Sequence, residues 1–441
     1  MAKQMMQDKA SEMAATQTVP TGYQQTEVGV IPEDWDIKEL QQICRVPITY
    51  GIVQCGPHIV NGIPYIRVSD MTARELDIDG MQRTSPQIAA AFARSTVDEG
   101  DIVYALRGKL GFVRSVPSSV AGANLTQGTA RISPVSNVFG RYVFWALQSP
   151  RSLEQATQGA KGSTFVEITL ASLKEIKIPV PRHKEEQKVI ADALSDIDEL
   201  IAGLEQLITK KQAIKTATMQ QLLTGRTRLP QFALRPDGTP KGYKSSKLGQ
   251  IPEDWDILSL AHVTTCLDNL RVPLNESQRL KMIGDIPYCG ANGIVGWVNE
   301  YLIDDDVILM AEDGGYFDEY ATRPIAYRIV GKCWVNNHAH ILKAQDEYEQ
   351  AYIFYSLVHK DIQRYLASGT RAKLNKSEME KIEILIPVKK QEQTDIATIL
   401  SDIDSELNAL EQKLAKARDV KQGMMQQLLT GRIRLPLEVQ A

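Results

Sequence analysis

Short turns that combine glycine with cationic side chains are the part of this chain best suited to chemistry. They occur in the runs RGKLGFVR, GAKG and GTRAK. A cation beside free backbone amides suits a phosphate group. The cations in these turns are Arg107, Lys109, Arg114, Lys161, Arg371 and Lys373. The pattern favours binding of phosphate groups.

A second set of side chains has the geometry to read the edges of nucleic-acid bases. Arginine matches guanine, and asparagine or glutamine matches adenine. The candidates are Arg67, Asn124 and Gln127 in the first half, Asn336, Asn337 and His338 in the second, and Arg271, Arg279 and Lys281 where the second variable block begins. For any single residue an ordinary surface or turn role is the simpler interpretation. The set favours DNA contact only through the architecture that carries it.

The sequence lacks the standard motifs of nucleotide and methyl-group chemistry. It contains no G-x-x-x-x-G-K-[ST] phosphate loop and no N-P-P-[YFW] run. Cys333, His338 and His340 match no zinc spacing, and the two histidines are better interpreted as polar residues on one face of a strand. Asp304–Asp306 is better explained as a solvated turn that leads into a strand. We therefore expect a chain that is not an enzyme and binds no metal.

A long stretch that occurs twice organises the rest of the chain. It begins with LSDID at Leu194 and again at Leu400, 206 residues later, and both copies close with MQQLLTGR. Neither copy contains proline before Pro230 or Pro436, and both are rich in helix-forming residues. A closing glycine suits the left-handed residue that ends a helix. The sequence predicts two helices of about 40 residues, each about 60 Å long.

Apolar residues recur in each copy at alternating intervals of four and three. That spacing keeps one stripe against a partner helix, as in a coiled coil. The stripe consists of Ile190, Leu194, Ile197, Ile201, Leu204 and Ile208 in the first copy and Ile396, Leu400, Ile403, Leu407, Leu410 and Leu414 in the second. Two such helices in one chain most simply pair with each other. The stripe weakens at Lys211 and Lys215, where either another protein docks or a solvated coiled coil stutters.

A shorter repeat precedes each of two dissimilar blocks. It reads GVIPEDWD from Gly29 and GQIPEDWD from Gly249, 220 residues later. Trp35 and Trp255 are interpreted as buried structural anchors, because a large aromatic residue beside proline is usually structural.

The blocks that follow are predicted to be α+β domains. Runs such as Ile63–Val68 and Trp334–Leu342 are typical of strands, and helices are expected over 142–159 and 352–369. The whole chain is then a pseudo-two-fold internal repeat. The predicted segments are a polar N-terminal segment at 1–19, a first domain at 20–181, a first long helix at 182–230, a linker and second domain at 231–387, and a second long helix with a tail at 388–441.

The overall composition sets further bounds. The 441 residues include 43% hydrophobic residues, enough for two or three domains. No apolar run is long enough to span a bilayer, and the polar N-terminus lacks the core of a signal peptide. Five cysteines without a C-x-x-C pair favour a reducing, cytoplasmic location.

The duplicated IPEDWD entrances and LSDID…MQQLLTGR helices, with two unlike blocks between them, resemble the specificity subunit of a type I restriction–modification system. The similarity covers nearly the whole chain after residue 20. Within the blocks, target-recognition motifs are similar to IPYIRVSDM, GDIVYALRGKLG, IPYCGANGIVGWV and WVNNHAHIL. The resemblance implies two α+β target-recognition domains separated by two long antiparallel coiled-coil helices.

The resemblance also implies a non-catalytic subunit that reads a bipartite, asymmetric double-stranded DNA target. Two methyltransferase subunits would bind the helices and the conserved regions, and restriction–translocation subunits would join them. S-adenosylmethionine, ATP and Mg would belong to those partners and not to this chain. Independently of this resemblance, a tandem repeat suggests a protein that reads two half-sites of DNA. Because the two blocks differ in sequence, the two half-sites should differ as well.

Charge leaves a competing interpretation open. Residues 41–181 carry 14 lysines and arginines against 10 acidic residues, a balance of +4, whereas residues 261–387 carry 13 against 18, a balance of −5. A coiled-coil scaffold that binds proteins, without sequence-specific DNA recognition, would suit the acidic second block. A fused restriction–modification enzyme is disfavoured by the missing catalytic motifs.

Overall fold

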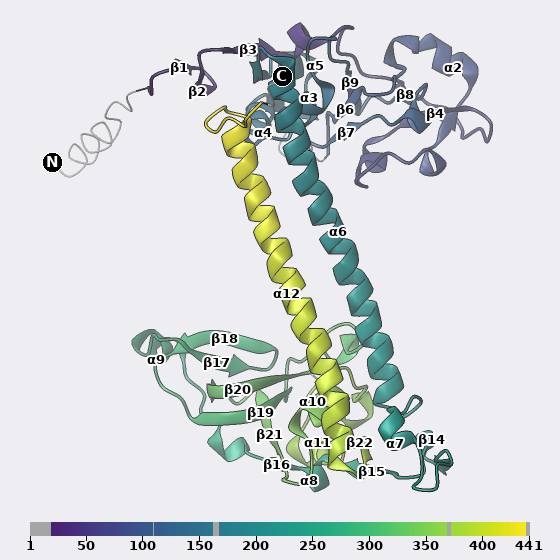
Figure 1. Cartoon of the computed structure of the whole chain (residues 1–441), viewed down its shortest axis with the longest axis vertical. Coiled ribbons are helices and arrows are strands. Elements are labelled where there is room, and N and C mark those ends of the chain that lie inside the picture. The colour runs from purple at the N-terminus through teal and green to yellow at the C-terminus, as the bar shows by residue number, and fades with distance from the viewer. Residues whose placement is uncertain (1–18, 109, 162–166, 368–371, 438–441) are drawn as a thin grey trace, which may run out of the picture. The chain divides into compact units, whose positions relative to one another are not determined.

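The computed structural model describes residues 19–108, 110–161, 167–367 and 372–437. The chain forms two compact units, each shown in Figure 1 with its own sheets and helices. The first unit combines Met1–Leu204 with Lys413–Ala441, and the second unit is Glu205–Gln412. The C-terminal segment therefore completes the unit that contains the N-terminal domain.

Two long helices supply parts of both units. Helix α6 spans Lys184–Leu222 and helix α12 spans Lys390–Leu428, with 39 residues each. At about 1.5 Å per residue each helix is about 58 Å long. Within the second unit Lys211 pairs with Glu406 and Lys215 with Asp404, so the two helices run antiparallel there.

The apolar stripe of each long helix is most deeply buried where the helix begins. Ile190 and Leu194 join the core of the first unit, and Ile396 and Leu400 join the core of the second. Further along each helix, the stripe alternates between buried and half-buried positions. The buried members are Ile201, Ile208, Leu407 and Leu414, and the half-buried members are Ile197, Leu204, Ile403 and Leu410.

The first unit carries two three-stranded sheets, with strand orders β5-β4-β8 and β7-β6-β9. Strand β4 runs parallel to β8, with Tyr65 opposite Asn124. Helices α3 and α4 follow the sheets. The bounds are β1 Tyr23–Thr26, β2 Gly29–Pro32, β3 Trp35–Glu39, β4 Ile63–Ile66, β5 Arg83–Thr84, α2 Pro86–Ala91, β6 Ile102–Ala105, β7 Val113–Ser115, β8 Asn124–Leu125, β9 Thr129–Ile132, α3 Gly140–Leu147, α4 Pro150–Gln158, β10 Ala160–Lys161, β11 Glu167–Ile168, α5 Leu170–Lys174 and β12 Lys177–Pro181.

The second unit repeats this plan with longer strands. Its sheet has the order β16-β21-β19-β20-β17-β18, and β17 runs parallel to β20 with Tyr288 opposite Trp334. The bounds are α7 Pro230–Ala233, β13 Tyr243–Ser246, β14 Gly249–Pro252, β15 Trp255–Ser259, α8 Leu260–Val263, β16 Thr264–Cys266, α9 Glu276–Lys281, β17 Ile286–Gly290, β18 Gly293–Val298, β19 Ile303–Ala311, β20 Ala326–Val335, β21 Ala339–Ala344, α10 Gln350–Leu357, α11 Lys376–Met379 and β22 Glu383–Pro387. The predicted α+β class and internal repeat are confirmed.

In each unit the entrance strand pairs with the strand that leads into the long helix. Trp35 in β3 lies opposite Pro181 in β12, and Trp255 in β15 lies opposite Pro387 in β22. The two tryptophan side chains are buried, with 1% and 0% exposure. This strand pair ties the entrance and the exit of each variable block together.

Three details differ from the sequence prediction. The helix expected over 142–159 is broken at Pro150, where Ser149 caps a second helix, and the helix expected over 352–369 ends at Leu357. The acidic run Asp304–Asp306 lies inside strand β19 and not in a turn, because Lys343 and Arg328 form ion pairs with its carboxylates.

No helix in the described part of the chain is long and apolar enough to cross a membrane.

Candidate nucleic-acid interface

In the first domain, candidate side chains from three separate loops line one cavity. Arg67 follows β4, Arg107 follows β6 and Gln127 follows β8, and all three border a cavity of about 670 Å³. Arg107 and Gln127 are exposed. The parallel pairing of β4 with β8 brings two of these loops side by side.

Arg67 is held in a defined orientation by Asp70. Its Nε lies 3.1 Å from Oδ2 and its Nη2 lies 2.7 Å from Oδ1, which is a two-point contact. The hydrogen bonds that Arg67 donates to Asp70 raise the pKa of Arg67, so the side chain stays charged. Because 39% of the side chain is exposed, the guanidinium is both oriented and accessible.

Two candidates of the first domain have structural roles instead. Asn124 is 1% exposed, and its side-chain amide donates to the carbonyl oxygens of Ala89 and Phe92. The prediction that Asn124 contacts DNA is therefore wrong, because the side chain fastens α2 to the sheet. Arg114 is half-buried and donates to the Ala73 carbonyl at 2.6 Å, an interaction that holds a loop.

The second domain assembles its candidates around two carboxylates at the end of β19. Arg271 donates to Glu312 at 2.5 Å, and Lys373 lies 3.0 Å from the same carboxylate. His338 Nδ1 lies 2.7 Å from Asp313 Oδ1. Four loops, distant in sequence, therefore meet at one place. Glu312 and Asp313 are functional candidates that the sequence reasoning missed, since nothing local marks them as partners of these cations.

A buried histidine supports this cluster from below. His340 is 1% exposed, with Nδ1 2.7 Å from Asp268 and Nε2 2.8 Å from the Leu374 carbonyl oxygen. Burial lowers the pKa of His340, but the hydrogen bonds with Asp268, Cys266 and Leu374 outweigh burial and raise the pKa to about 9. The sequence predicted that His338 and His340 share a polar surface of one strand. This prediction is wrong, because His340 points into the core.

Cys266, Asp268 and His340 are close enough together to suggest a metal site. Both ring nitrogens of His340 already have hydrogen-bond partners, and the raised pKa favours the protonated ring, which cannot ligate a metal. The arrangement is that of a charged hydrogen-bonded network.

The remaining candidates are distributed as follows. Asn337 is exposed beside His338, whereas Asn336 is 8% exposed and its side-chain oxygen accepts from the His338 amide; base contact by either asparagine stays a prediction. Arg279 and Lys281 lie on α9, where Arg279 stacks 5.6 Å from the Tyr288 ring. Lys109, Arg371 and the side chain of Lys161 lie outside the described residues.

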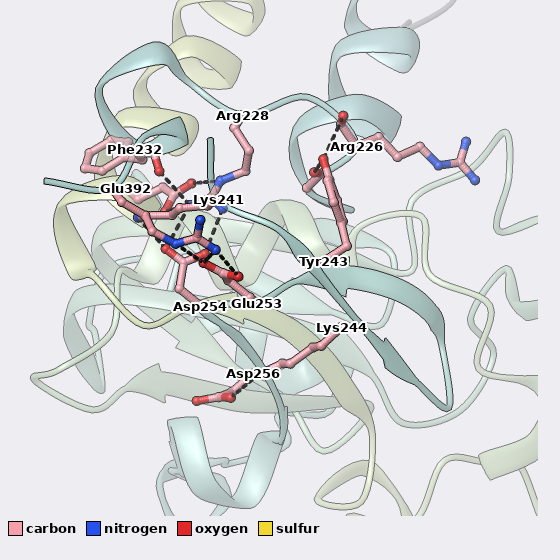
Figure 2. Close-up of polar contacts among 12 residues, drawn as sticks. Arg226, Arg228, Phe232, Lys241, Tyr243, Lys244, Glu253, Asp254, Asp256 and Glu392 are labelled. Carbon is pink, nitrogen blue, oxygen red and sulfur yellow. Dashed lines mark hydrogen bonds and ion pairs between the residues drawn. The ribbon is translucent and has the colours of Figure 1, made fainter. Parts of the chain in front are cut away.

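A separate polar junction joins each entrance motif to the end of a long helix. In the second unit Arg228 lies 2.7 Å from Asp254 and 2.8 Å from Glu392. Figure 2 shows these side chains and their contacts. Burial raises the pKa of Asp254, but the hydrogen bonds from Arg228 and Lys241 outweigh it and lower the pKa to about 2. We call this set of charges the arginine clamp.

The first unit contains the arginine and the two carboxylates of this clamp at equivalent positions, without a counterpart of Lys241. Arg434 lies 2.9 Å from Asp34 and 2.6 Å from Glu186. The hydroxyl groups of the entrance tyrosines add a matching contact, since Tyr23 donates to the Gly431 carbonyl oxygen and Tyr243 to the Gly225 carbonyl oxygen. The duplicated Arg of T-G-R-x-R-L-P was visible in the sequence but was not recognised as a site.

Glycine is required where each clamp closes. Gly225 and Gly431 have φ of 67° and 66°, a region that side-chain-bearing residues rarely adopt. A Cβ at either position would lie 2.4 Å from the ring of Pro252 or Pro32. The predicted helix-closing glycines therefore also allow the entrance motif to pack against the helix end.

The long helices are joined by a duplicated ion pair as well. Lys215 lies 2.5 Å from Asp404 in the second unit, and Lys421 lies 2.6 Å from Asp198 in the first. The lysine positions where the apolar stripe weakens are thus occupied by charged contacts between the helices.

Comparison with known proteins identifies the family of this doubled scaffold. The family model of the type I restriction modification DNA specificity domain matches residues 32–216 and 252–417. This chain belongs to the type I restriction–modification DNA specificity family.

Similarity to one member of the specificity family extends over most of the chain, and similarity to another covers about a third of it. A putative type I restriction enzyme specificity subunit, MjaX, from Methanocaldococcus jannaschii is 25% identical over 432 residues, which cover 94% of this chain and 97% of that one. The EcoBI specificity subunit of Escherichia coli is 30% identical over 164 residues, covering 36% of this chain and 34% of the relative.

Solved structures show the same fold at low identity. The crystal structure of a type I restriction–modification S subunit from M. genitalium matches with a TM-score of 0.61 and 18% identity, covering 89% of this chain and 96% of that one. A structure reported for complex assembly and conformational transition of the type I R-M system matches with a TM-score of 0.52 and 16% identity, covering 91% and 99%.

Proposed function

We propose that this chain is the DNA specificity subunit of a type I restriction–modification complex. Each α+β domain reads one half of a bipartite, asymmetric double-stranded DNA target. The long helices and the two arginine clamps form the scaffold on which two methyltransferase subunits dock, and restriction subunits join the assembly. This proposal extends the family membership to the particular parts of this chain.

One observation carries the proposal. The arginine of each clamp, its two carboxylate partners and one ion pair between the long helices occur at equivalent positions in both units, whereas the loops at the ends of the sheets differ between the domains. A repeat with identical supports and different reading loops suits recognition of two different half-sites.

The chain is proposed to work without catalysis of its own. S-adenosylmethionine, ATP and Mg are assigned to the partner subunits, and the complex is assigned to the cytoplasm. The arginine and glutamine side chains around the first cavity supply hydrogen-bond donors for base edges and phosphates.

The test is the pattern of base methylation in the host genome, with and without this gene. Deletion should remove methylation from one gapped, asymmetric motif, and a plasmid copy should restore it. An unchanged pattern, with the partner methyltransferase shown to be expressed and active, would contradict the proposal and favour a scaffold that binds only proteins.

A further inference from the structure

The two domains place one pair of positions at the same point of the fold. In the first domain Arg107 bridges Glu167, and in the second Asp313 bridges Lys373, both as antiparallel backbone bridges. The neighbouring backbone contacts also match, because Ile168 donates to the Leu106 carbonyl oxygen at 2.9 Å and Leu374 donates to that of Glu312 at 2.7 Å.

The strands that lead to these positions share their register. Ala105 at the end of β6 lies opposite Thr129 in β9, and Ala311 at the end of β19 lies opposite Ala339 in β21. Arg107 and Asp313 each stand two residues beyond that last pair. The two residues are therefore structurally equivalent.

The charges at the equivalent positions are inverted. Arg107 is an exposed cation that borders the first cavity together with Arg67 and Gln127. Its Nε would lie 2.8 Å from a Cβ at Gly128, so the absence of a side chain at Gly128 gives the guanidinium room to cross the loop.

In the second domain the neighbouring cations are already engaged by carboxylates. Arg271 lies 3.2 Å from Asp268 and 2.5 Å from Glu312, and Lys373 lies 3.0 Å from Glu312. Asp313 has a different partner, His338, and keeps 27% of its side chain exposed. Asp313 therefore offers a ligand the acceptor oxygens of a carboxylate. At the equivalent position of the first domain, Arg107 offers the donor groups of a guanidinium.

Base edges distinguish these two polarities. A guanidinium donates to the O6 and N7 acceptors of guanine, and a carboxylate accepts from the exocyclic amino group of cytosine or adenine. We propose that Arg107 and Asp313 are equivalent specificity-determining positions of opposite polarity: Arg107 reads guanine in one half-site, and Asp313 reads an amino-bearing base in the other. This inference rests on the proposed DNA-reading function.

The experiment uses the full chain in complex with its methyltransferase subunits. The complex methylates a library of random-sequence duplex DNA with S-adenosylmethionine, and sequencing maps the methylated motif. The variants are Arg107→Gln, Arg107→Lys and Asp313→Asn. Matched controls are Arg94→Gln and Asp318→Asn, which change exposed residues of the same type in the same domains.

The expected result is a change at one base position per variant. Arg107→Gln should lower the preference for guanine at one position of one half-site by about tenfold or more, and Arg107→Lys should retain part of it. Asp313→Asn should lower the preference for the amino-bearing base at one position of the other half-site, and the identity of that base decides between cytosine and adenine. The controls should leave the motif unchanged.

Two results would overturn the inference while the wild-type motif stands. One is an unaltered motif in all three variants. The other is a uniform loss of methylation over all sequences in Arg107→Gln, with the complex intact by sedimentation, which would make Arg107 a phosphate contact. A wild-type complex without sequence preference would overturn both the inference and the proposed function.

Discussion

The arginine clamps are alike in the two units, whereas the loops at the ends of the sheets differ. Arg228 and Arg434 occupy equivalent positions, and each contacts one carboxylate of an entrance motif and one of a long helix. At the ends of the sheets, equivalent positions carry Arg107 and Asp313. The clamp arginines, which are identical in the two units, join the parts of each unit. The residues that differ, Arg107 and Asp313, lie in loops at the ends of the sheets.

This comparison separates two kinds of charged residue that look alike in a sequence. A buried carboxylate such as Glu392 is costly unless its partner is present, so both members of a clamp must be kept. An exposed side chain such as Arg107 carries no such cost and is free to change.

Arg228→Met should give the largest loss of stability. The side chains of Arg228 and Glu392 are 8% and 2% exposed, so the variant leaves a buried carboxylate without its main partner, which costs about 3–5 kcal/mol. Arg434→Met should cost less, because 40% of the Arg434 side chain is exposed and water replaces part of the contact. Calorimetry measures both losses, and hydrogen exchange assigns each transition to a unit.

The matched controls for the clamps lie two residues earlier. Arg226 and Arg432 are exposed, so Arg226→Met and Arg432→Met should change stability by less than about 0.5 kcal/mol. If Arg228→Met melted like Arg226→Met, the clamp would have no role in holding the entrance motif to the helix.

His340→Gln should have an intermediate effect and depend on pH. The variant loses hydrogen bonds from a buried charged ring, at a cost of roughly 2 kcal/mol. The pKa of His340 is raised to about 9 in the folded chain, against about 6.5 when unfolded. Its contribution is therefore fully present below pH 6.5 and declines as the pH rises toward 9.

Thermal melting of the second unit between pH 6 and pH 9 measures this dependence. The difference in melting temperature between wild type and His340→Gln should become smaller as the pH rises. His338→Gln, a change of an exposed histidine in the same cluster, serves as the control. A difference in melting temperature that stays constant from pH 6 to pH 9 would rule out a charged His340.

The ion pairs between the long helices should have the smallest effect. Lys215→Met and Lys421→Met should each cost about 0.5–1 kcal/mol, because both contacts are partly exposed and salt screens them. Lys210→Met and Lys416→Met, which change exposed positions on the same helices, are the controls. Chemical denaturation at low and high salt compares the stability of these variants with that of their controls. A loss of stability that does not depend on salt would contradict an electrostatic contact.

The fold was largely predictable because the repeated sequence motifs follow from how helices and turns pack. The heptad spacing, the closing glycines and the entrance tryptophans each reflect a local requirement of helix or turn geometry, so the sequence alone predicted the two long helices and the internal repeat. The break at Pro150 was missed although proline is favoured at a helix start, since Ser149 as a cap required a second helix within the expected one.

The candidate site was less predictable because its partners are remote in sequence. Arg271 meets Glu312, and His338 meets Asp313, only after the loops of the sheet come together. Asn124 and Gln127 are close in sequence and similar in chemistry, yet one is buried against α2 and the other is exposed. Composition does not distinguish an asparagine that fastens a helix from one that reads a base.

The most direct test of the central claim is a domain exchange. Residues 41–181 would be replaced by the corresponding block of a family member that reads a different target, and the methylated motif of the reconstituted complex would be mapped. One half of the motif should change while the other half and the gap stay the same. An unchanged motif, or a change in both halves, would contradict a scaffold that presents two independent readers.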